Sequence, residues 1–146
     1  MSCIVLCGGG GKTTIFENYP ENFLDIDYFM WNNNKYITAL NKAIQNKDIN
    51  RISEIYEDAM KNDEELRNDS RILLVHTPIN AFWLNRDILK ILRPSKNLHK
   101  TNIKYRDDFF KKLAILDWEH VGNLDYLEFK NFVELENFIF ELVSKI

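Results

Sequence analysis

Four consecutive glycines followed by a lysine and two threonines are the feature of this 146-residue chain that most restricts its fold. They come directly after a short apolar run, residues 3–6. Glycines let backbone N–H groups close around a polyphosphate, and a lysine and a hydroxyl behind them can reach phosphate oxygens and Mg²⁺. We therefore expect a strand, a phosphate-binding loop and a helix that bind ATP and Mg²⁺. The expected binding residues are Gly8, Gly9, Gly10, Gly11, Lys12, Thr13 and Thr14.

The loop departs from the full pattern Gly-x-x-x-x-Gly-Lys-Ser/Thr at one position. Leu6 stands where the first glycine belongs, so we expect Gly8 or Gly9 to make the turn instead. The alternative is a flexible glycine-rich loop without a ligand. We favour binding because strand, loop and Lys-Thr-Thr follow one another in the order that the motif demands. Within the loop, Cys7 is expected to be a small filler rather than a redox-sensitive thiol.

The length and composition indicate one soluble domain over residues 1–146. Hydrophobic residues make up 45% and charged residues 28%, and we expect neither a membrane span nor a signal peptide. The chain has two cysteines, which are not expected to form a disulfide bond with each other. This favours a reducing, cytoplasmic setting, in a cell or in a virus-infected host. The net charge of −3 argues against a general nucleic-acid surface.

Strand-like and helix-like segments alternate along the chain, which predicts an α/β fold with a parallel sheet covered by helices on both faces. The expected strands are residues 2–6, 22–27, 71–76, 88–92 and 126–129. The expected helices are residues 12–18, 35–46, 51–67 (one helix or two short ones), 79–86, 97–116 and 132–145. In such sheets ligands bind beyond the carboxyl ends of the strands, so polar residues that follow strands should converge there.

Two carboxylates end the second expected strand, a dozen residues after Lys12. Alternation along a strand would place Asp25 and Asp27 on one face. Phosphoryl transfer needs a group that orients the acceptor hydroxyl and an anchor for metal-bound water. We assign the first role to Asp27 and the second to Asp25, with Thr13 as the direct metal ligand. The alternative for Asp25 is that it only caps the following helix.

Five basic residues and no acidic one occur between residues 93 and 106, and we favour phosphate contact for this cluster over a solvated helix face. Its members are Arg93, Lys96, Lys100, Lys104 and Arg106. The aromatic residues after Asp27, Trp31 among them, either stack an acceptor base or belong to the core or a subunit interface. For His76 we favour a hydrogen-bonded residue at a strand end over a catalytic base.

Three stretches carry a resemblance to a known group: residues 6–14 (LCGGGGKTT), Tyr19-Pro20, and residues 23–31 (FLDIDYFMW). They resemble small P-loop nucleoside and nucleotide kinase-like proteins, particularly phage-encoded ones. The resemblance implies a three-layer P-loop sandwich whose five parallel strands run in the order 2-3-1-4-5, with a C-terminal helix. It also implies transfer of the ATP γ-phosphate to a nucleoside, nucleotide or other small acceptor. Lys12, Asp27 and Arg93 would then be catalytic.

The same resemblance makes residues 93–112 a lid, with Trp31, Lys100, Lys104 and Arg106 facing substrate or forming that lid. The expected strand 71–76 ends in His76-Thr77 without the usual acidic metal-binding residue, so either Asp25 compensates or transfer is weak. Two further functions therefore stay open. One is an ATP-driven switch or partner-binding ATPase, and the other is a nucleotide-binding protein without transfer activity. The acceptor and the oligomeric state, including a homodimer, are not specified by the sequence.

Overall fold

The computed structural model describes residues 1–145, in which five parallel strands form one sheet in the order β2-β3-β1-β4-β5. The strands are β1 (Ser2–Leu6), β2 (Phe23–Asp25), β3 (Ile72–Val75), β4 (Asp87–Pro94) and β5 (Leu127–Phe129). The helices are α1 (Lys12–Asn18), α2 (Ile26–Trp31), α3 (Ile37–Gln45), α4 (Ile49–Asn62), α5 (Glu64–Arg67), α6 (Pro78–Leu84), α7 (Lys96–Ile103), α8 (Asp108–Val121) and α9 (Phe132–Ser144). The predicted α/β class, parallel sheet, strand order and C-terminal helix are confirmed.

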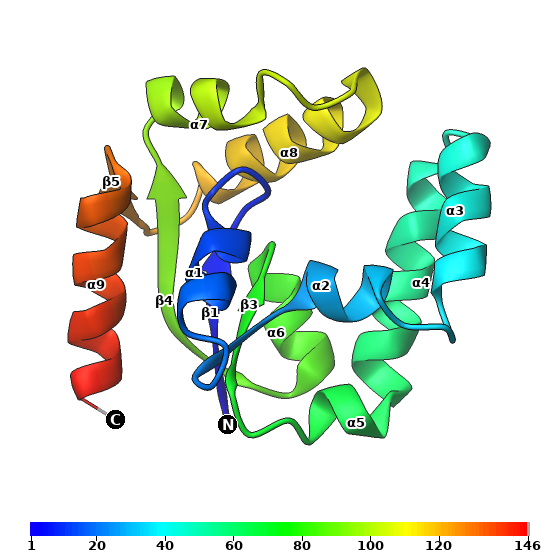
Figure 1. The fold of residues 1–146 in the computed structure, drawn as a ribbon, viewed down its shortest axis with the longest axis horizontal. Helices are drawn as coiled ribbons and strands as arrows, with labels where there is room; N and C mark the ends of the chain where they lie inside the picture. Colours follow the sequence, from blue (N-terminus) through cyan, green and yellow to red (C-terminus); the bar gives the residue numbers. More distant parts are fainter. Residues whose placement is uncertain (146) are drawn as a thin grey trace.

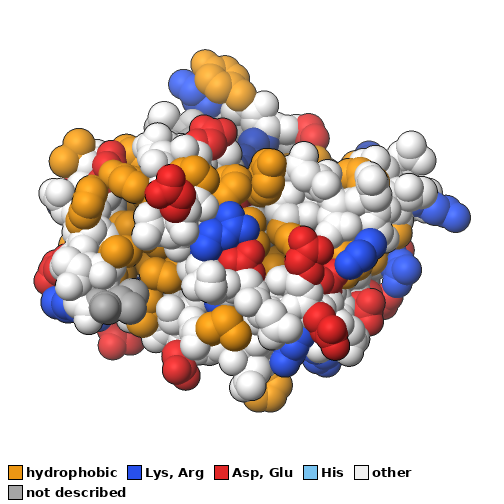
Figure 2. All heavy atoms as spheres, turned by 60° about the horizontal axis from the view of Figure 1, so that its bottom comes forward, with side chains coloured by type: hydrophobic (Ala, Val, Ile, Leu, Met, Phe, Trp, Pro, Cys, Tyr) orange, Lys and Arg blue, Asp and Glu red, His pale blue; other side chains and the backbone are white. Residues whose placement is uncertain are grey.

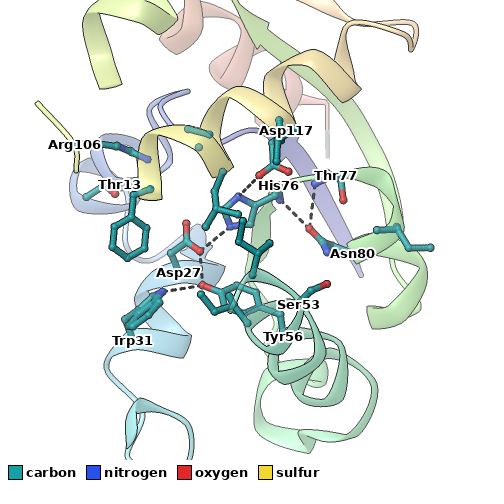
Figure 3. A pocket seen from close by; sticks show the side chains of 18 of the residues that line it. Thr13, Asp27, Trp31, Ser53, Tyr56, His76, Thr77, Asn80, Arg106 and Asp117 are labelled. Carbon is teal, nitrogen blue, oxygen red and sulfur yellow. Dashed lines mark hydrogen bonds and ion pairs between the residues drawn. The ribbon is translucent and has the colours of Figure 1, made fainter. Parts of the chain in front are cut away.

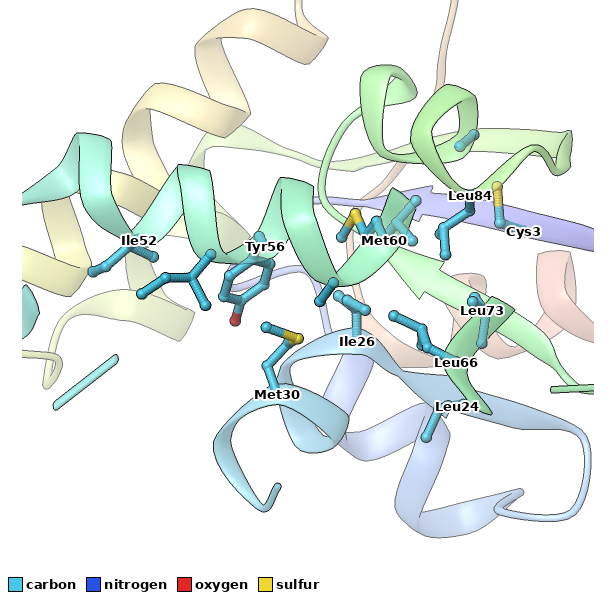
Figure 4. Packing of buried hydrophobic residues seen from close by; sticks show 14 of the residues in the cluster. Cys3, Leu24, Ile26, Met30, Ile52, Tyr56, Met60, Leu66, Leu73 and Leu84 are labelled. Carbon is cyan, nitrogen blue, oxygen red and sulfur yellow. The ribbon is translucent and has the colours of Figure 1, made fainter. Parts of the chain in front are cut away.

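Consecutive residues of β1 belong to opposite faces of the sheet, because side chains alternate along a strand. Cys3 and Val5 pack into a core beneath α4 and α6, on the side drawn in Figure 4. Ile4 and Leu6 pack into a second core with Ile15 of α1 and with α9. Both faces are thus buried, which is why the strand reads as a continuous apolar run.

The second strand ends earlier than the sequence indicates, and the prediction that Asp27 lies on it is wrong. β2 stops at Asp25, whose side chain accepts a hydrogen bond from the backbone N–H of Asp27 over 3.0 Å and caps α2. Aspartate favours this N-cap position because its carboxylate satisfies a free N–H of the first turn. Asp25 therefore caps α2 through one of its carboxylate oxygens, and strand alternation does not position the two carboxylates.

Two long predicted helical segments are each divided. Residues 51–67 form parts of α4 and α5, and residues 97–116 form parts of α7 and α8, with Asp107 capping α8 through the Phe110 N–H. In Figure 1, α7 and α8 lie above the loop that follows β1, at the carboxyl ends of the strands, whereas the N-terminus lies at the opposite edge. This arrangement places the polar ends of the strands beneath a helical cover.

The surface carries charges of both signs. On the face drawn in Figure 2, Lys and Arg side chains are interspersed with Asp and Glu, and hydrophobic side chains lie between them. Among residues 1–145, no helix is long and apolar enough to cross a membrane.

Candidate functional site

The loop between β1 and α1 turns where its glycines adopt left-handed backbone conformations. Gly9 has φ 81° and Gly11 has φ 99°, so Gly9, one of the two expected residues, makes the turn. Leu6 takes no part in the turn because its side chain is buried in the core and lies under Gly10, where a Cβ would come within 2.7 Å of it. Burial raises the pKa of the Cys7 thiol to about 11, which supports a filler role rather than a reactive thiolate.

Lys12 lies across this loop rather than out in solvent. Its side chain is only 4% exposed, and Nζ donates a hydrogen bond to the Leu6 carbonyl over 3.0 Å. The same Nζ is 3.7 Å from Asp27 Oδ2. The ammonium group is therefore held at the inner edge of the loop, beside a carboxylate.

Asp27 is the centre of a hydrogen-bond network that joins three elements (Figure 3). Its Oδ1 lies 2.7 Å from His76 Nε2 and accepts a second hydrogen bond, also 2.7 Å, from the Tyr56 hydroxyl. The Tyr56 hydroxyl in turn accepts a hydrogen bond from Trp31 Nε1 over 2.9 Å. The carboxylate is thus held from α4 and from the end of β3, and its free oxygen faces Lys12.

His76 lies between two carboxylates. Its Nδ1 is 3.5 Å from Asp117 Oδ2 on α8, while Nε2 bonds Asp27. Burial alone would favour the neutral imidazole, but the Asp27 charge, the hydrogen bond from Nε2 to Asp27 and the nearby Asp117 carboxylate raise the pKa of His76 to about 9. Although burial opposes its charge, Asp27 has a lowered pKa because His76 and Lys12 stabilise the carboxylate. At neutral pH His76 is a cation without a free lone pair, which supports a hydrogen-bonding role over a base.

The pair Thr13 and Asp25 has the chemistry of a magnesium site. The Thr13 hydroxyl donates to Asp25 Oδ2 over 3.3 Å, and burial together with the neighbouring Asp27 charge raises the pKa of Asp25. A divalent cation would relieve the cost of that buried carboxylate. Among residues 1–145 no cluster of three His, Cys, Asp or Glu residues could hold a metal alone, so phosphate and water would complete the shell. The residues present fit Mg²⁺ bound together with a polyphosphate.

Two cavities meet at this network. The smaller, about 400 Å³, is lined by residues 9–14 and by an apolar wall. That wall consists of Leu98, Phe129, Phe132 and Leu135. The larger, about 690 Å³, lies between α2, α4, α6 and α8 and includes Trp31 and His76 (Figure 3). Thr13, Asp27 and Arg106 line both cavities and form their common boundary.

Helix α7 covers the glycine loop. His99 Nε2 donates to the Gly8 carbonyl over 2.8 Å, and Asn102 Nδ2 donates to the Gly9 carbonyl over the same distance. Burial lowers the pKa of His99, so the imidazole is neutral with its hydrogen on Nε2. Part of the predicted lid segment, residues 93–112, therefore packs directly on the loop.

Arg106 lines both cavities, but the other residues expected to form the basic lid do not share its position. The Arg93 guanidinium stacks on the Trp118 ring, 3.4 Å from its centroid, and Nε donates to the Trp118 carbonyl over 3.0 Å. Lys100 is exposed, and Lys104 Nζ lies over the Tyr105 ring. Arg93, Lys100 and Lys104 line neither of the two cavities as described for residues 1–145. The structure thus brings Arg106 into the site, and it holds Arg93 in a packing role.

Sequence reasoning missed Tyr56 and Asp117. The helical spacing of apolar residues within 51–67 predicts that the Tyr56 ring is buried, which is correct, but it gives no partner for the hydroxyl. Asp117 lies three and four residues after Ala114 and Leu113, so a carboxylate on an otherwise apolar helix face was the available signal. No family model, curated protein or solved structure matches the chain.

Proposed function

We propose that this protein is a P-loop phosphotransferase of the nucleoside or nucleotide kinase type, which transfers the γ-phosphoryl group of ATP to a hydroxyl of a small acceptor. The observation that carries the proposal is the common boundary of the two cavities. Thr13, Asp27 and Arg106 line both, so a triphosphate in one cavity would end beside an acceptor in the other. Positioning of this kind supplies most of the catalysis in phosphoryl transfer.

The smaller cavity suits the donor. Residues 9–14 offer backbone N–H groups, and the buried Lys12 ammonium sits beside the loop with a single hydrogen bond to a carbonyl among residues 1–145. The apolar wall of this cavity, which includes Phe129 and Phe132, would accept an adenine ring. Thr13, and Asp25 through water, would hold Mg²⁺, which when bound neutralises phosphate charge and polarises the γ-phosphoryl group.

In the proposed reaction the acceptor oxygen bonds to the γ-phosphorus while the bond from that phosphorus to the β–γ bridging oxygen breaks. Asp27 orients the acceptor hydroxyl and receives its proton, and ADP leaves. The lowered pKa of Asp27 keeps it ionised, which suits orientation more than early proton removal in a loose transition state. His76 and Tyr56 hold the carboxylate, and Arg106 neutralises charge that develops on the transferred group.

A second candidate is a nucleotide-binding protein without transfer activity. Two observations favour it. Asp27 already pairs with His76, Tyr56 and Lys12. In addition, His76 stands where the resemblance calls for an acidic residue. A switch ATPase is a third candidate, and it would release free phosphate without an acceptor.

One assay separates the three. ATP consumption with Mg²⁺ is measured over a panel of small hydroxyl acceptors, and ADP, free phosphate and phosphorylated product are all quantified. ADP and product in equal amounts with one class of acceptor support the kinase. ADP with free phosphate and no acceptor preference supports the switch ATPase, and ATP binding without turnover supports the binding protein.

A further inference from the structure

Taking the proposed transfer reaction as its premise, we infer that the acceptor is an uncharged nucleoside rather than a nucleoside monophosphate. The inference deepens the proposed function, because it names the class of molecule that the larger cavity takes. It follows from the charge of that cavity, from its aromatic lining and from the way in which both are tied to Asp27.

The charged lining of the larger cavity is poor in cations. Three carboxylates line it, and Arg106 is the one Lys or Arg among its lining residues in the part of the chain described. These carboxylates belong to Asp27, Asp107 and Asp117. Arg106 also lines the donor cavity, where the triphosphate would engage it. A second, dianionic phosphate on the acceptor would therefore meet like charges without a cation of its own.

His76 does not supply the missing cation. Its Nε2 is 2.7 Å from Asp27 and its Nδ1 is 3.5 Å from Asp117, so its charge is shared between two carboxylates. Tight recognition of a phosphate uses free arginines or lysines with several charge-assisted hydrogen bonds. The larger cavity instead presents three carboxylates and one arginine among its described lining residues. An uncharged acceptor is not repelled by these carboxylates.

The aromatic lining suits a flat ring. Trp31, Trp83 and Phe110 all line the cavity, whose volume of about 690 Å³ accommodates a base with its sugar. The Trp31 ring is fixed edge-on to Phe110, with centroids 6.1 Å apart. Fixed aromatic rings stack bases without losing conformational freedom on binding.

The stacking ring and the acceptor-orienting carboxylate belong to one hydrogen-bonded chain. Trp31 Nε1 donates to the Tyr56 hydroxyl, which donates to Asp27 Oδ1. A base against Trp31 therefore has the Asp27 carboxylate one side chain away (Figure 3). At the far wall, Asn80 Oδ1 accepts the backbone N–H groups of His76 and Thr77, which leaves its NH₂ group, unpaired among residues 1–145, to donate to a base carbonyl.

The test compares each nucleoside with its own 5′-monophosphate, using wild-type protein and ATP·Mg²⁺. We expect kcat/KM for the nucleosides to exceed that for the monophosphates by about tenfold or more. Binding is measured separately by quenching of tryptophan fluorescence, since Trp31 and Trp83 line the cavity. Nucleosides should quench, and monophosphates should quench only at concentrations about tenfold higher.

A charge variant tests the physical cause. Leu116 and Ile115 are neighbouring exposed residues of α8, 47% and 38% accessible, but only Leu116 is among the described residues that line the cavity. Leu116→Arg adds a cation to the wall and should shift the monophosphate-to-nucleoside ratio of kcat/KM by about fivefold or more toward the monophosphate. The matched control Ile115→Arg should leave that ratio unchanged.

The outcomes separate this inference from the proposed function. Preferred transfer to monophosphates, or to a 5′-hydroxyl oligonucleotide, would overturn the inference and leave the kinase intact. Quenching by nucleosides without transfer to any acceptor would overturn the kinase and support an uncharged ligand for the cavity. Equal quenching by both classes, or by neither, would overturn the inference.

Discussion

His76 Nε2 lies 2.7 Å from Asp27 Oδ1, so the residue that follows β3 is ion-paired with the first turn of α2. The Tyr56 hydroxyl bonds the same oxygen over 2.7 Å. The carboxylate that our proposal assigns to the acceptor is therefore held by residues 49 and 29 positions away in the chain. Its orientation is a tertiary property, and its loss should be visible in catalysis and in stability.

Replacing Asp27 with asparagine should remove transfer while leaving ATP binding nearly intact, because none of the donor contacts proposed here comes from Asp27. We expect kcat to fall by about 10²–10⁴-fold and the ATP Kd to change by less than about threefold. Asp58→Asn, an exposed carboxylate on α4, is the matched control and should behave as wild type. A larger loss of ATP affinity in Asp27→Asn than in Lys12→Ala would contradict the assignment.

The His76–Asp27 pair should make stability depend on pH. The folded pKa of His76 is raised from 6.5 to about 9, so its contribution is fully present below pH 6.5 and is lost as the pH rises through about 9. We expect the free energy of unfolding to fall by about 3 kcal/mol over this interval. Urea unfolding at several pH values measures it, and His76→Gln should flatten the slope. An unchanged slope in that variant would show that another group is responsible.

Among the basic residues of the 93–112 segment, only Arg106 should be catalytic. Arg106→Ala should lower kcat by about a hundredfold or more, because arginines that meet a transferring phosphoryl group contribute effects of that order. Lys100→Ala and Lys104→Ala should each change kcat by less than about threefold, since these side chains line neither cavity as described.

Arg93→Ala serves as a different kind of control. It should lower stability by about 1–3 kcal/mol through lost stacking on Trp118 and lost hydrogen bonds, with kcat little changed in the folded fraction. Steady-state kinetics of the four variants beside thermal unfolding separate the two effects. Equal kinetic losses in Arg106→Ala and Lys100→Ala would contradict the placement of Arg106.

Gly11→Ala should destabilise the loop more than Gly8→Ala. Gly11 has φ 99°, and a Cβ there would come within 2.9 Å of Leu135 Cδ2. At Gly8 the nearest atom, Ala114 Cβ, would be 3.4 Å away, an ordinary contact distance. We expect a loss of about 2 kcal/mol or more at Gly11 and less than about 1 kcal/mol at Gly8. Chemical denaturation of both variants checks this difference, and the reverse order would contradict the loop geometry.

The sequence allowed the strands and helices with strong local patterns to be predicted closely. β1 and α1 have the predicted bounds, because an apolar run, a glycine loop and a helix signal follow each other without ambiguity. The alternation in Asp25-Ile26-Asp27 predicts a strand through Asp27, yet the capping bond of Asp25 starts a helix there. Local alternation and local capping compete, and three residues are too few to decide between them.

The sequence predicts the site residues that follow strands. It does not predict the contacts made by side chains from helices that are distant in the chain. Asp27 and His76, which follow β2 and β3, converge as residues beyond the carboxyl ends of parallel strands should. Arg93 follows the same rule in sequence, but its guanidinium packs on Trp118, a contact that depends on the position of α8. Tyr56 enters from α4, and periodicity reveals the buried ring without revealing the partner of its hydroxyl.

The central claim is that donor and acceptor bind in separate cavities that meet at Thr13, Asp27 and Arg106. It is tested most directly by the crystal structure of the protein with adenosine linked through a chain of phosphates to a second nucleoside. We expect the phosphates along residues 8–14, the adenine against Phe132 and the second base against Trp31. Density for both nucleosides outside these two cavities, or phosphates away from the glycine loop, would contradict the account.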